Sequence, residues 1–363
     1  MLKRLAMLGL LLPAMAWGGE PAGAGPAPGE RALLDRDVPG IIAQAGVPSV
    51  SIAQIKGGRV VLTAAYGAQQ AGVPATPATL YNIASLTKQI TAEVILRAAS
   101  RGEVSLDEPM YRVWTDPDIA GDERRKLLTL RLVLSHRSGF PNWRDHKTGL
   151  AFERAPGEGW GYSGEGYVYA AKFTETKIGR PFEDLAQAYL FEPAGMISTA
   201  YTQKPWYAGR SAIPTDASGK SLVPELTHRY IAADLAYTTA GDYAAFMTQV
   251  LRDRDLTPAL AAARSQVAAD TWAADCAGAK AAACPCREGV GLGWLVLDFG
   301  EAKLLMHTGK DAGVFTFAYL DPATGDGAVI LTNSDKGGNI VIPILERLGA
   351  RAAFVRYLKS EAS

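Results

Sequence analysis

Ser85 and Lys88 are the two residues of this chain whose types and spacing most directly suggest chemistry. They open an apparently helical segment, and residues three positions apart lie on the same face of a helix, so the hydroxyl and the amine can meet. A serine hydroxyl is a weak nucleophile that needs an activating neighbour, which a desolvated lysine can provide. At a helix N-terminus, the backbone N–H of Ser85 is also free to donate to a developing oxyanion. Because Ser-x-x-Lys is also a common accidental pattern, its meaning depends on further residues.

Two later segments offer the partners that such a site needs. In residues 161–164 (Gly-Tyr-Ser-Gly), a predicted polar turn, Tyr162 offers an exposed phenol as a proton shuttle. Residues 307–309 (His-Thr-Gly) end an apolar strand, where Gly309 would let a substrate backbone approach closely. Either segment alone is an ordinary loop or strand end. Together with Ser85 and Lys88, they form a candidate catalytic set in which the serine hydroxyl is the nucleophile.

Aromatic residues gather around the second of these segments. They could line an apolar pocket for an acyl group, or they could equally be packing, and the sequence does not separate the two interpretations. The residues are Trp143, Trp160, Tyr162, Tyr167 and Tyr169.

The three motifs resemble the signature of serine β-lactamases and penicillin-binding proteins. The sequence is similar to the branch with class C β-lactamases, DD-peptidases and family esterases, where the second motif is Tyr-x-Asn and the third is Lys-Thr-Gly or His-Thr-Gly. The resemblance covers nearly the whole mature chain. It includes residues 81–84 (Tyr-Asn-Ile-Ala), 134–139 (Leu-Ser-His-Arg-Ser-Gly), 191–196 (Phe-Glu-Pro-Ala-Gly-Met) and 291–294 (Gly-Leu-Gly-Trp). Within the second of these, the resemblance implies that His136 braces a loop and is not a base.

The resemblance also implies a role for each motif residue. Ser85 would attack a carbonyl carbon, while Lys88 and Tyr162 would manage its proton. Thr308 would meet the polar or carboxylate end of the substrate. The oxyanion hole would consist of the backbone N–H groups of Ser85 and, by analogy, of Lys310.

Two positions depart from the family pattern. Gly164 stands where the second motif usually has asparagine, which removes a side chain that would hydrogen-bond a substrate amide. His307 stands where many relatives have lysine, so a permanent charge is replaced by a group that titrates near neutrality. Both departures weaken the case for an efficient β-lactamase. The expected substrate is a β-lactam, a D-amino-acid peptide or a small ester. The alternatives are an esterase with neither of the other activities, and a penicillin-binding or sensor domain without turnover.

The elements that position these residues follow from the hydrophobic pattern. We expect a hairpin of residues 49–55 and 60–66 and strands later in the chain, while the segment after Ser85 and the middle of the chain are mainly helix and loop. Helices are expected near both ends. The expected later strands are 292–299, 303–307, 314–320 and 328–332, and the expected terminal helices are 31–46, interrupted by Pro39 and Gly40, and 340–358.

Strands at both chain ends predict an α+β fold: an antiparallel sheet built from both termini, flanked by helices, with a mainly helical inserted region. This is the architecture of the β-lactamases and transpeptidases. The domain would span residues 31–363, with the sheet part at about 31–84 and 288–363 and the helical part at about 85–287.

The N-terminus predicts export. Residues 1–16 combine a basic start, an apolar run from Leu5 to Leu12 and an Ala-Met-Ala end, which is the layout of a signal peptide. The apolar run is too short for a membrane anchor. Residues 17–30 are rich in Pro, Gly and Ala and predict a flexible leader. We therefore expect a bacterial protein that is periplasmic or secreted.

The chain holds three cysteines, and an exported chain meets an oxidising compartment. Cys276 is therefore expected to form a disulfide with Cys284 or Cys286. A metal site is not expected, because no histidine lies nearby in sequence to complete a ligand set.

Charge and composition limit the partners. Lys plus Arg and Asp plus Glu number 37 each, so the formal net charge is zero and gives no reason to expect nucleic-acid binding. A small-molecule or peptide substrate without a cofactor fits better. The sequence makes no prediction of oligomeric state.

Overall fold

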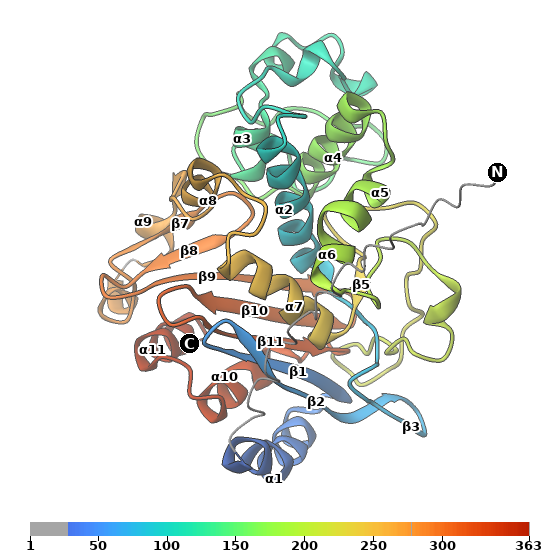
Figure 1. Cartoon of the computed structure of the whole chain (residues 1–363), viewed down its shortest axis with the longest axis vertical. Helices are drawn as coiled ribbons and strands as arrows, with labels where there is room; N and C mark the ends of the chain where they lie inside the picture. The colour runs from blue at the N-terminus through green and yellow to red at the C-terminus, as the bar shows by residue number, and fades with distance from the viewer. Residues whose placement is uncertain (1–27, 277, 363) are drawn as a thin grey trace, which may run out of the picture.

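The computed structural model describes residues 28–276 and 278–362, and an antiparallel sheet of nine strands forms its centre (Figure 1). Strands from both ends of the chain lie side by side in it, because β1 pairs with β11. In spatial order the strands are β3 (Val73–Pro74), β2 (Arg59–Gln70), β1 (Ser49–Lys56), β11 (Asp326–Thr332), β10 (Val314–Asp321), β9 (Lys303–Asp311), β8 (Leu295–Asp298), β7 (Arg287–Val290) and β6 (Ala269–Asp270).

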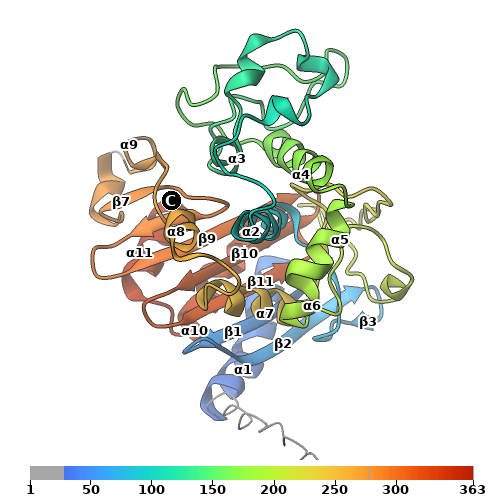
Figure 2. The same cartoon turned by 45° about the horizontal axis from the view of Figure 1, so that its top comes forward.

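Helices cover both faces of this sheet (Figures 1 and 2). Three helices from the two chain ends pack on one face: α1 (Pro28–Ala45), α10 (Gly338–Arg347) and α11 (Ala352–Glu361). The inserted helical region covers the other face. Its helices are α2 (Thr87–Ser100), α3 (Leu130–Leu134), α4 (Gly164–Ile178), α5 (Phe182–Ala186), α6 (Glu192–Ala194), α7 (Ala240–Leu251) and α8 (Pro258–Arg264). The short helix α9 (Trp272–Asp275) contacts β7, and its Trp272 packs against the core on the side of the terminal helices.

The central strands are buried on both faces, which explains their almost continuous apolar sequences. On β11, Ala328 and Ile330 belong to the core beneath the terminal helices, while Val329 and Leu331 belong to the core beneath the inserted region. Side chains alternate between the faces of a strand, so one strand serves two cores. The fold class predicted from the sequence is confirmed.

Several element boundaries differ from the prediction. Helix α1 begins at Pro28, within the segment expected as leader, and continues through Pro39 and Gly40. The single helix expected over 340–358 is two helices, separated at Gly349, whose positive φ of 67° only glycine adopts easily. Strand β8 begins at Leu295, not Leu292. The predicted signal peptide, and the leader up to residue 27, lie outside the described residues.

The edge of the sheet carries the cysteines. Cys276 and Cys284 form a disulfide, and Cys286 is a free, exposed thiol. Strands β6 and β7 lie at this edge, and β6 falls in the part of the chain that was predicted to be helical. Both strands are short, so their sequence pattern is weak.

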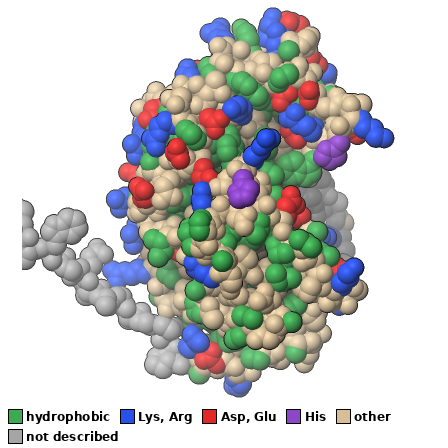
Figure 3. Space-filling view, turned by 90° about the vertical axis from the view of Figure 1, so that its right-hand side faces the viewer, with side chains coloured by type: hydrophobic (Ala, Val, Ile, Leu, Met, Phe, Trp, Pro, Cys, Tyr) green, Lys and Arg blue, Asp and Glu red, His purple; other side chains and the backbone are tan. Residues whose placement is uncertain are grey.

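The surface carries acidic and basic side chains, as expected from their equal numbers in the sequence. On the face shown in Figure 3, acidic and basic side chains lie interspersed. Within residues 28–276 and 278–362, no helix combines the length and the apolar character needed to cross a bilayer. In the same part of the chain, no group of three or more His, Cys, Asp or Glu side chains is placed to hold a metal ion.

Candidate active site

Ser85 lies in a short 3-10 helix, Ala84–Leu86, that leads directly into α2. The preceding residue, Ala84, has a positive φ of 46°, which is uncommon for a residue with a side chain. Asn82 holds this turn, because its Oδ1 accepts the N–H of Ala84 at 2.8 Å. Backbone strain of this kind occurs at functional sites when the surrounding structure enforces it. Ser85 is thereby presented, partly exposed, at the start of a buried helix.

Lys88 lies below Ser85 and is 1% exposed. Its Nζ donates to Ser85 Oγ at 2.9 Å and to the carbonyl oxygen of Ala233 at 2.9 Å. Burial lowers the pKa of Lys88 to about 7, and the charge of Asp234 opposes this decrease. A substantial fraction of the amine is therefore neutral near pH 7 and can take a proton from the serine.

Tyr162 approaches the same pair from the loop before α4. The centre of its ring lies 4.8 Å from Lys88 Nζ. Burial raises the pKa of Tyr162 well above its usual value, although a hydrogen bond with Ser85 opposes this rise. The phenol is therefore protonated at neutral pH and can donate a proton. The structure brings together Ser85, Lys88 and Tyr162, which the sequence singled out.

His136 supports this tyrosine. Its ring stacks on Tyr162 with 4.4 Å between ring centres, and its Nδ1 accepts the N–H of Ser163 at 3.0 Å. Burial lowers the pKa of His136 well below its usual value, so the ring is neutral and Nδ1 can accept. These contacts agree with the loop-bracing role expected from the sequence.

Strand β9 forms the opposite wall of the site, and residues 307–309 lie within it. The sequence predicted that the strand ends at this motif, but it continues to Asp311. A Cβ atom at Gly309 would lie 2.5 Å from the carbonyl oxygen of Ile83 and 3.0 Å from the nitrogen of Ser85, and would also meet Thr316 Oγ1. The close approach that requires glycine is therefore between β9 and the chain's own nucleophile turn. The approach of a substrate backbone to this strand stays a prediction.

His307 is neutral in this site. Its Nδ1 donates to the carbonyl oxygen of Thr308 at 2.6 Å. Although the residue is only partly buried overall, desolvation of its ring lowers the pKa to about 4, and the charge of Lys88 adds to this effect. The expectation that His307 titrates near neutrality is wrong. Thr308 and Lys310 are exposed on the same strand.

Gly164 is the first residue of α4, and an indole occupies the space beside it. A Cβ atom at Gly164 would lie 2.8–3.0 Å from three carbons of the Trp143 ring. An asparagine at position 164 would therefore collide with Trp143. The departure from the family pattern at Gly164 is coupled to this tryptophan.

The aromatic residues divide between the two interpretations. Tyr167 and Tyr169 are buried and pack in the core of the inserted region. Trp143 and Trp160 are 43% and 42% exposed, and the Trp143 ring centre lies 5.9 Å from Lys88 Nζ. Trp160 lines a largely apolar pocket of about 380 Å³ together with Tyr162 and His307. The two tryptophans thus border the site, and the two tyrosines do not.

The sequence analysis missed Asp234. Burial raises its pKa to about 6, and the charge of Asp311 adds to this effect. The next residue, Leu235, has a positive φ of 62°, which is the same kind of strain as at Ala84. No motif marks this acid, because it lies in a separate loop whose Ala233, 145 residues from Lys88 in the chain, accepts the hydrogen bond of Lys88 Nζ.

Comparisons with known proteins agree with this fold. The sequence profile of a family described as beta-lactamase matches residues 34–350. Over 158 residues, 35% of the chain, the sequence is 30% identical to the esterase EstB of Burkholderia gladioli, and this match covers 40% of that relative's length. The chain is 24% identical over 336 residues to the D-alanyl-D-alanine-carboxypeptidase/endopeptidase AmpH of Escherichia coli K12, covering 83% of this chain and 84% of that one.

A solved structure has the same architecture. The D-alanine carboxypeptidase AmpC of Burkholderia cenocepacia matches with a TM-score of 0.71 at 20% identity, covering 88% of this chain and 98% of that one. At this identity, the likeness shows the fold alone.

Proposed function

The chain belongs to the beta-lactamase family of serine hydrolases, and on that premise we propose that it is an exported esterase that works through an acyl-enzyme at Ser85. The observation that carries this proposal is the contact of 2.9 Å between Lys88 Nζ and Ser85 Oγ, made by a lysine whose pKa is lowered to about 7.

In acylation, neutral Lys88 takes the proton of Ser85 as its Oγ forms a bond to the substrate carbonyl carbon. The resulting oxyanion would accept hydrogen bonds from the backbone N–H groups of Ser85 and Lys310. When the bond to the leaving group breaks, the proton passes from Lys88 through Tyr162 to the leaving oxygen. Water then attacks the acyl-enzyme, and Lys88, neutral again after the first transfer, takes its proton. The bond between the acyl carbon and Ser85 Oγ breaks, the carboxylic acid leaves, and the proton passes from Lys88 to Oγ, which regenerates Ser85.

An ester fits this site better than a β-lactam or a D-amino-acid peptide. Neutral His307 supplies no charge for a substrate carboxylate, and Gly164 supplies no side-chain amide. A site that lacks such donors discriminates less among carbonyl substrates. The similarity to an esterase supports this choice, while the similarity to a carboxypeptidase makes peptide hydrolysis the alternative to exclude.

The test compares three substrates with the same enzyme preparation: a p-nitrophenyl ester, a chromogenic cephalosporin and a peptide ending in D-Ala-D-Ala. We expect turnover of the ester, slow or absent β-lactam turnover, and loss of activity in Ser85→Ala. A cephalosporin or peptide turned over faster than any ester would contradict the esterase proposal. Covalent labelling by a penicillin without turnover of any substrate would instead indicate a sensor domain.

Export is tested separately. N-terminal sequencing of protein released from the periplasm is expected to begin near Trp17, because residues 1–16 have the layout of a signal peptide. An exported protein that retains Met1 would contradict cleavage.

A further inference from the structure

Trp143 is an exposed aromatic ring held beside the nucleophile pair. Its six-membered ring lies over Gly164, where a Cβ atom would be 2.8 Å away, and its ring centre is 5.9 Å from Lys88 Nζ. With 43% of its surface exposed, a large part of the indole is available for contact with a ligand. A ligand covalently attached to Ser85 would therefore find an apolar aromatic surface on this side of the site.

The residues on both sides of Trp143 are fixed to the start of α4. The backbone oxygen and Oδ1 of Asn142 accept the N–H of Gly164 at 3.0 and 2.9 Å, and the same backbone oxygen accepts the N–H of Glu165 at 3.0 Å. These bonds hold the loop that carries Trp143 directly against the helix end.

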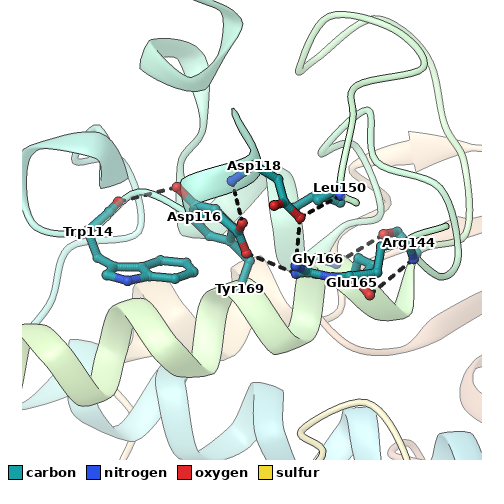
Figure 4. Close-up of polar contacts among 9 residues, drawn as sticks. Trp114, Asp116, Asp118, Arg144, Leu150, Glu165, Gly166 and Tyr169 are labelled. Carbon is teal, nitrogen blue, oxygen red and sulfur yellow. Dashed lines mark hydrogen bonds and ion pairs between the residues drawn. The ribbon is translucent and has the colours of Figure 1, made fainter. Parts of the chain in front are cut away.

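Arg144, on the other side, joins three carboxylates (Figure 4). It pairs with Glu165 at 2.8 Å, with Asp116 at 2.9 Å and with Asp118 at 3.1 Å. Glu165 and Asp116 are almost completely buried, so these pairs are shielded from solvent and salt. Trp143 is therefore fixed before a substrate arrives, and little ordering of its loop is needed on binding.

From these contacts we propose that Trp143 is a specificity-determining residue that selects substrates with an aromatic ring in the acyl group. The proposal rests on the proposed acyl-enzyme function. Tyr162 lines the pocket beside His307 and Trp160. Because Tyr162 protonates the leaving group in the proposed mechanism, the proposal assigns this pocket to the leaving group and the Trp143 side to the acyl chain. Gly164 is needed for this position of Trp143, because a side chain at residue 164 would displace the indole.

The test compares p-nitrophenyl phenylacetate with p-nitrophenyl butyrate, which share a leaving group, after correction for their rates of hydrolysis by hydroxide. We expect kcat/KM to favour the phenylacetate by about tenfold, the order of magnitude for one aromatic pair with its buried area. Trp143→Ala should abolish this preference, and Trp143→Phe should retain most of it. Gly164→Ala, which displaces the ring without deleting it, should also reduce the preference.

Trp206→Ala is the matched control, because Trp206 packs in a separate small cluster with Tyr207, away from the site. It should leave the ratio of the two kcat/KM values unchanged. A ratio that is equal in wild type and Trp143→Ala, with Ser85→Ala inactive on both esters, would overturn the role of Trp143 and leave the proposed function intact. Hydrolysis of either ester by Ser85→Ala would instead show that the proposed function is wrong.

Discussion

Replacing Gly309 with alanine tests whether strand β9 fixes the nucleophile turn. The added Cβ would lie 2.5 Å from the carbonyl oxygen of Ile83 and 3.0 Å from the nitrogen of Ser85. It would also meet Thr316 Oγ1, which donates to the same Ile83 oxygen at 2.9 Å. Two of these three obstacles are backbone atoms, so a rotation of a side chain cannot relieve them. Either β9 or the turn that carries Ser85 must move by about 1 Å, and a displacement of this size costs about 100-fold in rate.

The assay is kcat/KM for a p-nitrophenyl ester, measured together with the thermal unfolding midpoint. A 100-fold loss corresponds to about 2.7 kcal/mol of transition-state stabilisation. Gly40→Ala is the matched control, since a Cβ at this position in α1 meets nothing within 4 Å. It should leave kcat/KM unchanged and slightly raise the unfolding midpoint, because alanine favours a helix over glycine.

Two outcomes would refute this reasoning. A folded Gly309→Ala protein with more than half of the wild-type kcat/KM would show that the turn is not fixed by β9. Rescue of activity by adding Thr316→Ala would show that the side chain, and not the backbone of Ile83, limits the approach.

The remaining predictions concern pH and the disulfide. Because neutral Lys88 is the base and its pKa is lowered to about 7, kcat/KM is expected to rise with pH through about 7. Asp234→Asn removes the charge that raises this pKa, so the rise should move to lower pH by about one pH unit, and an unmoved profile would count against the assignment. His307→Asn should leave the position of the rise unchanged, because the pKa of His307, about 4, lies below it; a displaced rise would show that His307 titrates with the base. Serine at both Cys276 and Cys284, eight residues apart, should lower the free energy of unfolding in urea by about 2–3 kcal/mol, and no loss would show that the bridge does not constrain the unfolded chain.

Local features of this protein could be predicted from the sequence. The meeting of Ser85 and Lys88 depends only on the geometry of one helical turn. The pairing of the first hairpin and the return of the last strands follow from short apolar runs separated by turn residues. The α+β architecture follows from their order in the chain.

Features set by distant contacts could not be predicted. The position of Trp143 depends on the ion pairs of Arg144 with residues 21 to 28 positions away in the chain. The neutral state of His307 depends on burial of its ring and on the charge of Lys88, whereas its residue type alone suggests titration near neutrality. The Gly164→Asn and His307→Lys double variant would restore the family residues at both positions. Because an asparagine at position 164 would collide with Trp143, this variant would require removal of Trp143 as well.

The central claim is that Ser85 is the nucleophile, and covalent labelling tests it most directly. The protein is treated with a fluorophosphonate, and the modified peptide is identified by mass spectrometry in wild type, Lys88→Ala and Ser85→Ala. We predict one adduct on Ser85 in the wild type, much slower labelling in Lys88→Ala, and none in Ser85→Ala with the fold intact. An adduct on another residue that persists in Ser85→Ala would contradict the account.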